Sequence, residues 1–144
     1  MRTRAPFTQL YLHCVWATWD RVPLIAPQIE KPLYACIAAK CHELKCETIA
    51  IGGVSDHVHL LVRLHTTISV ADLVKEVKGA SSHLIAQKIA PNEFFKWQGA
   101  YGAFTVSKDD VSNVKAYVEN QKEHHAEEHL WIDWEQTMIE ETDL

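Results

Sequence analysis

The stretch ETIAIGGVSDHVHLLVRLH, residues 47–65, decides the fold that we predict. Residues 47–53 and 57–65 are rich in β-branched and aliphatic side chains, as strands are, and only residues 54–56 lie between them. Two strand-like runs joined by so short a connection predict an antiparallel hairpin.

Side chains in a strand alternate between its two faces. The second run therefore divides into a core-facing set, Val58, Leu60, Val62 and Leu64, and an opposite set, His57, His59, Leu61 and Arg63. His57 and His59 share a face about 7 Å apart along the strand, so their imidazoles could converge on one divalent cation. The alternative is that both are polar residues on the exposed side of a half-buried strand, and the short HxH pattern alone does not decide.

The segments before the hairpin predict one strand and one helix. Residues 7–19, FTQLYLHCVWATW, are rich in aromatic and β-branched types and indicate a first strand. Pro23 and Pro27 then exclude regular strand pairing. Apolar residues recur at helical spacing over 28–45, and Pro32 falls in the first turn, where a missing N–H does little harm.

The segments after the hairpin predict a helix, a strand and a last helix. Ser69 and Asp72 have the spacing of a capping box and open a helix that ends before Pro91. A strand follows near residues 101–106, and a second Ser–Asp pair, at positions 107 and 110, opens a helix to about residue 128.

The element order β-α-β-β-α-β plus a last helix predicts an α+β fold of the ferredoxin-like (split βαβ) type. This is an antiparallel sheet with helices on one face and an added carboxy-terminal helix. We assign residues 1–128 to one domain, because 144 residues suit a single core, and 129–144 to an extension of unassigned role. Apolar residues suggest that the extension forms a helix packed on the body or on a partner: Trp131, Ile132, Trp134, Met138 and Ile139.

Composition favours a cytoplasmic protein. The amino terminus does not resemble a signal peptide, and no apolar run approaches the roughly 18 residues that cross a bilayer. The four cysteines include no CxxC pair, so we expect buried or half-buried thiols rather than a zinc or redox site. The net charge of -5 argues mildly against a protein that holds DNA phosphates, although much of the negative charge lies beyond residue 126.

The last predicted helix contains VSNVKAYVENQKEHH, residues 111–125, and carries a tyrosine beside its buried stripe. The stripe consists of Val111, Val114 and Val118. Tyr117 and Gln121 lie four residues apart at its edge, although a tyrosine in such a place commonly packs with its hydroxyl toward water. His124 and His125 could be further metal ligands or part of a solvated helix end.

Together, HxH on a central strand and YxxxQ on a terminal helix about sixty residues later resemble a known family. The family is that of the HUH-type single-tyrosine transposases of the insertion sequence 200 type, and it includes the REP-associated tyrosine transposases. Further segments look like that family in the same order: VWATWDRVPL, DHVHLLV, LVKEVKGASSHLI, WQGAYGAFTVS and VKAYVENQKEHH. The resemblance covers the chain up to about residue 128.

The resemblance implies a DNA transposase that acts as a metal-dependent single-strand endonuclease and strand transferase. His57, His59 and Gln121 would bind a divalent ion, Mg²⁺ or Mn²⁺, and Tyr117 would form a covalent 5′-phosphotyrosine with the DNA. Members of the family are dimers, so the resemblance also implies a homodimer whose active site two subunits could share. The expected partner is single-stranded DNA that contains hairpins.

Contacts with that DNA are assigned more loosely. Candidates are Lys75, Lys78 and Lys115 for phosphates, and Trp97 and Tyr101 for stacking on unpaired bases. The alternative is that the lysines lie on a solvated helix face and the aromatic side chains pack in the core.

Two other functions stay open. A domesticated or inactive relative would bind structured single-stranded nucleic acid without transposition. The acidic net charge motivates this alternative, and the intact HxH and YxxxQ motifs argue against it. A hydrolytic metal enzyme would use His57, His59 and His124 without covalent catalysis.

Overall fold

The computed structural model of the chain describes residues 4–126 and 135–138. Four strands form one antiparallel sheet in the order β2-β3-β1-β4. The strands are β1 (Tyr11–Ala17), β2 (Glu47–Val54), β3 (His57–Arg63) and β4 (Gly102–Val106). This order, with β1 and β3 in the centre, is that of the predicted ferredoxin-like split βαβ fold.

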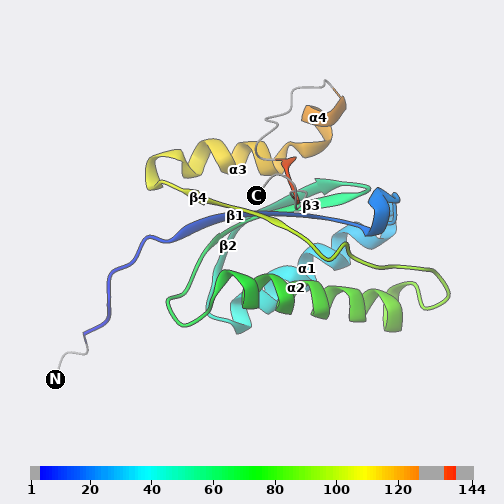
Figure 1. The fold of residues 1–144 in the computed structure, drawn as a ribbon, viewed down its shortest axis with the longest axis horizontal. Helices are drawn as coiled ribbons and strands as arrows, with labels where there is room; N and C mark the ends of the chain where they lie inside the picture. Colours follow the sequence, from blue (N-terminus) through cyan, green and yellow to red (C-terminus); the bar gives the residue numbers. More distant parts are fainter. Residues whose placement is uncertain (1–3, 127–134, 139–144) are drawn as a thin grey trace.

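The helices are divided between the two faces of the sheet. Helices α1 (Pro27–Glu43) and α2 (Val70–Leu84) lie side by side on one face, and α3 (Val111–Glu119) lies on the other (Figure 1). Helix α4 (Gln121–Ala126) follows α3 and turns away from it. The arrangement agrees with the prediction of two helices on one face plus a carboxy-terminal helix.

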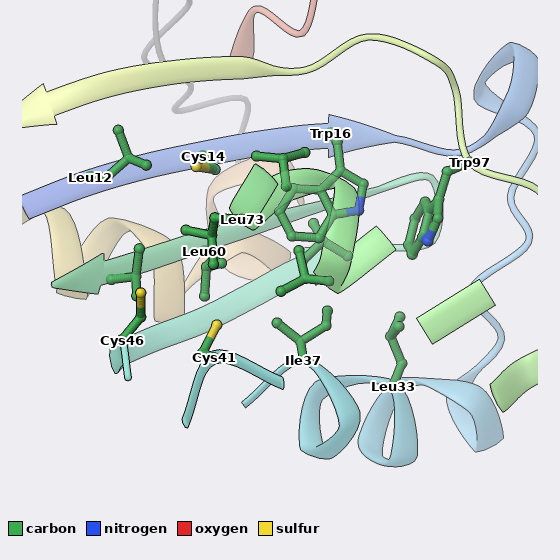
Figure 2. Close-up of a cluster of buried hydrophobic side chains, with 14 of the residues drawn as sticks. Leu12, Cys14, Trp16, Leu33, Ile37, Cys41, Cys46, Leu60, Leu73 and Trp97 are labelled. Atoms are coloured by element: carbon green, nitrogen blue, oxygen red, sulfur yellow. The ribbon is translucent and has the colours of Figure 1, made fainter. Parts of the chain in front are cut away.

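The main hydrophobic core fills the space between the sheet and helices α1 and α2 (Figure 2). Val58, Leu60 and Val62 of β3 belong to it, as the alternation of the strand predicted. Figure 2 also shows Trp16 and Trp97 in this core, where their rings meet edge to face with centroids 6.0 Å apart.

A smaller cluster joins α3 to the opposite face of the sheet. It consists of Ala50, Leu61, Val114 and Val118. The face of β3 that carries His57 and His59 is therefore covered by a helix rather than open to solvent.

One of the two predicted capping pairs is confirmed. The Ser69 hydroxyl accepts a hydrogen bond from the Asp72 N–H at 3.1 Å, but α2 ends at Leu84 and continues as a π-helical turn, Ile85–Ile89. At the second pair, the Ser107 hydroxyl donates to the Asp110 carboxylate at 3.2 Å and caps no backbone N–H.

The prediction of one continuous helix to about residue 128 is wrong. A 3-10 turn, Lys108–Asp110, precedes α3, and α3 ends at Glu119. Asn120 leaves helical geometry at φ -105 and ψ 28, and its side-chain amide donates to the Ala116 carbonyl at 2.8 Å. The chain then starts again as α4.

Three cysteines are buried and Cys36 is half-buried, and all four are free thiols, as predicted. None of the described helices is both long enough and apolar enough to span a bilayer. Of the extension 129–144, the structure describes only 135–138, so the predicted helix lies otherwise outside the described residues.

Candidate active site

His57 and His59 lie on the central strand β3, beneath α3. Their exposed fractions are 1% and 0%, and their ring centroids are 5.1 Å apart. The sheet register places His59 opposite Val15 of β1 and Gly52 of β2. The two imidazoles are therefore not solvated polar groups on an open sheet face.

The orientation of His57 is set by the residue before it. Nδ1 of His57 donates to Oδ1 of Asp56 at 2.7 Å, so Nδ1 carries a proton and Nε2 faces the site. Burial by itself would lower the pKa of His57, but the hydrogen bonds to Asp56 and Glu135 outweigh it and raise the pKa to about 9.

The orientation of His59 is set by a third histidine, His13 of β1. Nε2 of His13 lies 2.8 Å from Nδ1 of His59, and His13 is fully buried. Burial, with a further contribution from His59, lowers the pKa of His13 to about 3, so His13 is neutral at neutral pH. A neutral imidazole can either donate or accept here, and in both cases Nε2 of His59 points into the site.

The structure brings Tyr117 and Gln121 to the same place. Tyr117 is 2% exposed, and its ring meets His59 edge to face with centroids 5.8 Å apart. Gln121, the first residue of α4, is 1% exposed and donates from Nε2 to the Tyr117 carbonyl at 3.0 Å. Its Oε1 lies 3.1 Å from Nε2 of His125.

A glycine allows α3 to lie this close to the sheet. An added Cβ at Gly52 would lie 1.9 Å from the carbonyl oxygen of Val118, which is backbone and cannot move aside cheaply. Gly52 pairs directly with His59 in the sheet. The close approach therefore places Tyr117, the residue before Val118, over the histidine pair.

A carboxylate that sequence reasoning missed, Glu135, lies between these groups. Its Oε2 is 2.6 Å from Nε2 of His59, and its Oε1 accepts from the Tyr117 hydroxyl at 2.9 Å. Burial would raise the pKa of Glu135, but hydrogen bonds from His57 and His59 hold it below its ordinary value. Glu135 forms no recognisable spacing pattern with the YxxxQ motif. In the sequence it stands out only as one of several acidic residues in the extension 129–144.

The two histidines of α4, His124 and His125, contact different residues around His57 and Glu135. Nε2 of His125 lies 3.1 Å from Nε2 of His57 and 3.1 Å from Oε1 of Glu135. His124 instead stacks on the Tyr117 ring, with centroids 4.8 Å apart. His125 is thus the one that faces the cluster, whereas the hydrolytic hypothesis had used His124.

The donor set fits a divalent metal ion. His57, His59 and Glu135 offer one ligand atom each, and these atoms all lie within 4.8 Å of one another. Two imidazoles and a carboxylate are a mixed N/O set that Mn²⁺ accepts, and both imidazoles are oriented by a second partner. The amide oxygen of Gln121 contacts His125, whose Nε2 in turn contacts His57 and Glu135.

Two of the predicted DNA contacts are structural residues. Trp97 is 6% exposed in the main core and donates from Nε1 to Ser81 at 3.1 Å, so it offers no open ring face for a base. Lys78 is half-buried and donates to the backbone carbonyls of Gln98 and Ala100 at 2.5 and 3.4 Å. We do not keep these two residues as DNA contacts.

The other three candidates are not gathered at the site. Lys75 is exposed on α2, on the face of the sheet opposite to the histidines. Tyr101 is half-buried against the main core, and the Lys115 ammonium lies 3.9 Å from the Glu119 carboxylate on α3.

An exposed aromatic residue that was not among the predicted DNA contacts, Trp19, lies just beyond the end of β1 that pairs with His57. Trp19 is 43% exposed, and the Lys96 ammonium lies 4.1 Å from its ring centroid. It follows β1 at the end where Ala17 pairs with His57. Arg21, next along the chain, has a positive φ of 56°, and its guanidinium lies 4.0 Å from the Asp56 carboxylate.

Comparison with known proteins identifies the family. Residues 6–121 match the model of a family described as IS200-like transposases. The ISDra2 transposase TnpA of Deinococcus radiodurans is 25% identical over 118 residues, which is 78% of this chain and 84% of that protein.

Solved structures agree in fold. The crystal structure of a Deinococcus radiodurans protein assigned as a transposase matches with a TM-score of 0.67 and 25% identity, over 84% of this chain and 97% of that one. A REP-associated tyrosine transposase bound to a REP hairpin matches in fold with a TM-score of 0.62 and 14% identity, over 91% and 74% of the two chains. Because the family model covers residues 6–121 of the 144, the chain belongs to the IS200-like transposase family.

Proposed function

We propose that the chain is a metal-dependent single-strand DNA endonuclease and strand transferase, with Tyr117 as its nucleophile. The observation that carries the proposal is the meeting of Tyr117 with the buried pair His57 and His59. One carboxylate contacts all three side chains, at 2.9, 3.4 and 2.6 Å. Membership of a transposase family supports a reaction on DNA.

Tyr117 would cleave by transesterification. Its phenolic oxygen loses its proton to a base and forms a bond to the phosphorus while the bond from phosphorus to the 3′ oxygen breaks. The 3′ oxygen takes up a proton and leaves as a 3′-hydroxyl. The product is a 5′-phosphotyrosine, which keeps the energy of the phosphodiester. A second 3′-hydroxyl can therefore reverse the reaction and join the strand without ATP.

His57, His59 and Gln121 would hold the divalent ion, Mg²⁺ or Mn²⁺, and Glu135 would add a carboxylate ligand beside the histidine pair. When bound, such an ion stabilises the negative charge that develops on the phosphate oxygens during attack. The residues of the chain orient the reaction: Asp56 and His13 hold the imidazoles, and Gly52 lets α3 bring the phenol to them.

The substrate that we propose is single-stranded DNA that contains a hairpin. The REP hairpin bound to a protein of the same fold supports this choice. Trp19 with Lys96 is the contact that we favour for an unpaired base, because an exposed ring beside a cation suits stacking next to a phosphate.

The test is covalent attachment. We expect the chain, incubated with labelled single-stranded hairpin DNA and Mn²⁺, to form an adduct that survives denaturation. Tyr117→Phe removes one oxygen atom and should abolish the adduct while leaving the binding of the DNA within about twofold, since chemistry and not binding is lost. Tyr11→Phe is the matched control. An adduct of normal yield in Tyr117→Phe would exclude the mechanism.

A relative that only binds nucleic acid is the second candidate, and the burial of the Tyr117 hydroxyl group in a side chain that is 2% exposed is the observation that favours it. It predicts tight binding of the hairpin with no adduct at any Mn²⁺ concentration. EDTA separates the two candidates, because removal of the ion should stop adduct formation in an enzyme and change little in a binding protein.

A further inference from the structure

The turn that follows β1 carries two residues in a rare backbone conformation. Asp20 has φ 51° and ψ 28°, and Arg21 has a φ of 56°. Side chains other than glycine adopt this left-handed region at a cost, and they stay there only where the surroundings hold them. Two such residues in succession change the direction of the chain at the end of the sheet where β3 begins (Figure 1).

Hydrogen bonds on both sides hold this turn. The Thr18 N–H donates to the Asp56 carbonyl at 2.9 Å, and the Thr18 hydroxyl donates to the Val22 carbonyl at 2.6 Å. On the other side, the Trp19 N–H donates to the Lys96 carbonyl at 2.9 Å. The backbone of the turn is therefore fixed against the β2–β3 connection and against the segment before β4.

The Arg21 guanidinium lies beside His57, and its contacts there are loose. Its Nη1 lies 3.5 Å from Nδ1 of His57 and 4.0 Å from Oδ1 of Asp56. The proton of that Nδ1 already goes to Asp56, at 2.7 Å. Within residues 4–126 and 135–138 these are the polar contacts of the Arg21 side chain, which is 47% exposed. A guanidinium has five N–H donors, so most of them are left for a ligand.

Two lysines of α3 and α4 are paired with carboxylates. The Lys122 ammonium contacts Glu30, and the Lys115 ammonium lies 3.9 Å from one acid of its own helix, Glu119. A DNA strand brings one negative charge for each nucleotide, and the net charge of the chain is -5, so local cations have to receive the strand. Arg21 is a cation that directly adjoins the histidine pair.

A phosphate at the histidine pair would place its neighbour near this guanidinium. Nε2 of His57 faces the site, and only the width of the imidazole ring separates that atom from the contact with Arg21. The Trp19 ring, with the Lys96 ammonium over it, is 43% exposed in the same turn. A strand that is bound at the histidines and stacked on this ring therefore passes Arg21.

We propose that Arg21 binds the phosphate next to the scissile one, and that Arg21, Trp19 and Lys96 together hold one unpaired nucleotide beside the cleaved linkage. The inference rests on the proposed function, because His57 and Tyr117 define where the scissile phosphate lies. The planar fork of an arginine matches two oxygens of a phosphate. Arg21 thus positions the strand and takes no part in the making or breaking of bonds.

The experiment compares the parent chain with Arg21→Ala and Arg21→Lys. Arginine, alanine and lysine all have a Cβ, so the left-handed backbone costs each of them a similar amount. Lys88→Ala is the matched control. It removes one positive charge from an exposed lysine of the π-helical turn Ile85–Ile89, which continues α2 on the other face of the sheet.

Three quantities are measured at DNA concentrations below saturation. The first is the affinity for Mn²⁺ without DNA, and the second is the salt dependence of the affinity for hairpin DNA. The third is the rate of adduct formation on strands in which one phosphate at a time is replaced by an uncharged methylphosphonate.

In the parent chain, we expect a methylphosphonate at one linkage next to the cleaved one to slow adduct formation about tenfold, because a hydrogen bond between charged groups is lost. In Arg21→Ala the same replacement should slow it less than about twofold, since the partner of that phosphate is already absent.

Arg21→Ala should also lower the slope of log affinity against log salt concentration by about 0.7, the value for one phosphate of a single strand. Arg21→Lys keeps the charge and should keep the slope. The affinity for Mn²⁺ should change less than about twofold in every variant, because the contacts of Arg21 with Asp56 and His57 are loose. Lys88→Ala should match the parent chain in all three measurements.

Two results would overturn the inference. Equal sensitivity of the parent chain and Arg21→Ala to methylphosphonates at every linkage would show that no phosphate contacts Arg21. An unchanged salt slope with a loss of Mn²⁺ affinity in Arg21→Ala would show that Arg21 acts only by holding Asp56 and His57. Failure of the proposed function looks different, since no chain would then form an adduct. The salt slope, which needs no reaction, would still show whether Arg21 contacts a phosphate.

Discussion

Two side chains outside the HxH motif set the directions of its imidazoles. Asp56 accepts from Nδ1 of His57, and His13 contacts Nδ1 of His59 at 2.8 Å. In both rings this leaves Nε2 as the atom that faces the site. Partners of this kind fix the tautomer and the orientation of metal-binding histidines, and their loss usually weakens metal binding.

Asp56→Ala should therefore lower the affinity for Mn²⁺ by about tenfold, because it removes the acceptor that orients His57. Asp56→Asn keeps an acceptor without its charge and should have a smaller effect. Asp109→Asn, an exposed acid in the turn before α3, is the control. Titration with Mn²⁺ at fixed pH measures all three, and equal affinities would show that His57 needs no help from Asp56.

At the scale of residues, the sequence predicted the site unevenly. Strand alternation brought His57 and His59 to one face. The spacing of Tyr117 and Gln121 predicted that they meet on one continuous helix, whereas they meet across the break at Asn120. The contact of Glu135 could not be predicted, because it depends on the path of a chain segment that no periodicity describes. Trp97 lies in the core, which was the alternative that the sequence left open, because an aromatic residue beside Gly99 is equally compatible with the core and with the surface.

Gly52 connects two elements. It lies on β2 opposite His59, and the Val118 carbonyl of α3 occupies the space that a side chain would need. Backbone packs on backbone here, so the distance between helix and strand is set by the missing Cβ. A larger residue would lift the helix that carries Tyr117.

We expect Gly52→Ala to lower the free energy of unfolding by about 1–3 kcal/mol, as overpacking usually does. It should also slow adduct formation, because the phenol moves away from the histidines. Gly79→Ala is the control: an added Cβ there meets nothing, and alanine in the exposed face of α2 should stabilise by about 0.5–1 kcal/mol. Urea unfolding measures both values, and equal stability of the two variants would contradict the packing argument.

At the scale of elements, prediction succeeded where one local signal dominated. The Ser69 cap and the 47–65 hairpin were both found from short patterns. The break at Asn120 was missed, because one asparagine disfavours a helix interior only mildly and its bond to the Ala116 carbonyl forms only once the turn exists. That break matters, because it turns Gln121 and His125 toward the histidine pair.

The whole molecule contains a complete candidate site within one chain. Helix α3 packs on its own sheet through Val114 and Val118, and the Tyr117 and His59 rings of the same chain are 5.8 Å apart. A homodimer, which we propose from the resemblance to the family, would then carry two separate sites. The alternative is that each Tyr117 serves the partner's histidines.

Mixing two inactive variants decides between these arrangements. Tyr117→Phe keeps the histidines, and a double variant with His57→Ala and His59→Ala keeps the tyrosine. If the site is built within one chain, as the packing of α3 on its own sheet indicates, no subunit of a mixed dimer has both parts, so we expect no adduct after the variants are mixed and refolded together. Exchange of subunits is verified by mass spectrometry of differently tagged chains. If Tyr117 instead acts on the partner, each mixed dimer contains one intact site and one site that lacks both the histidines and the tyrosine hydroxyl. About half of the sites in the mixed dimers would then react.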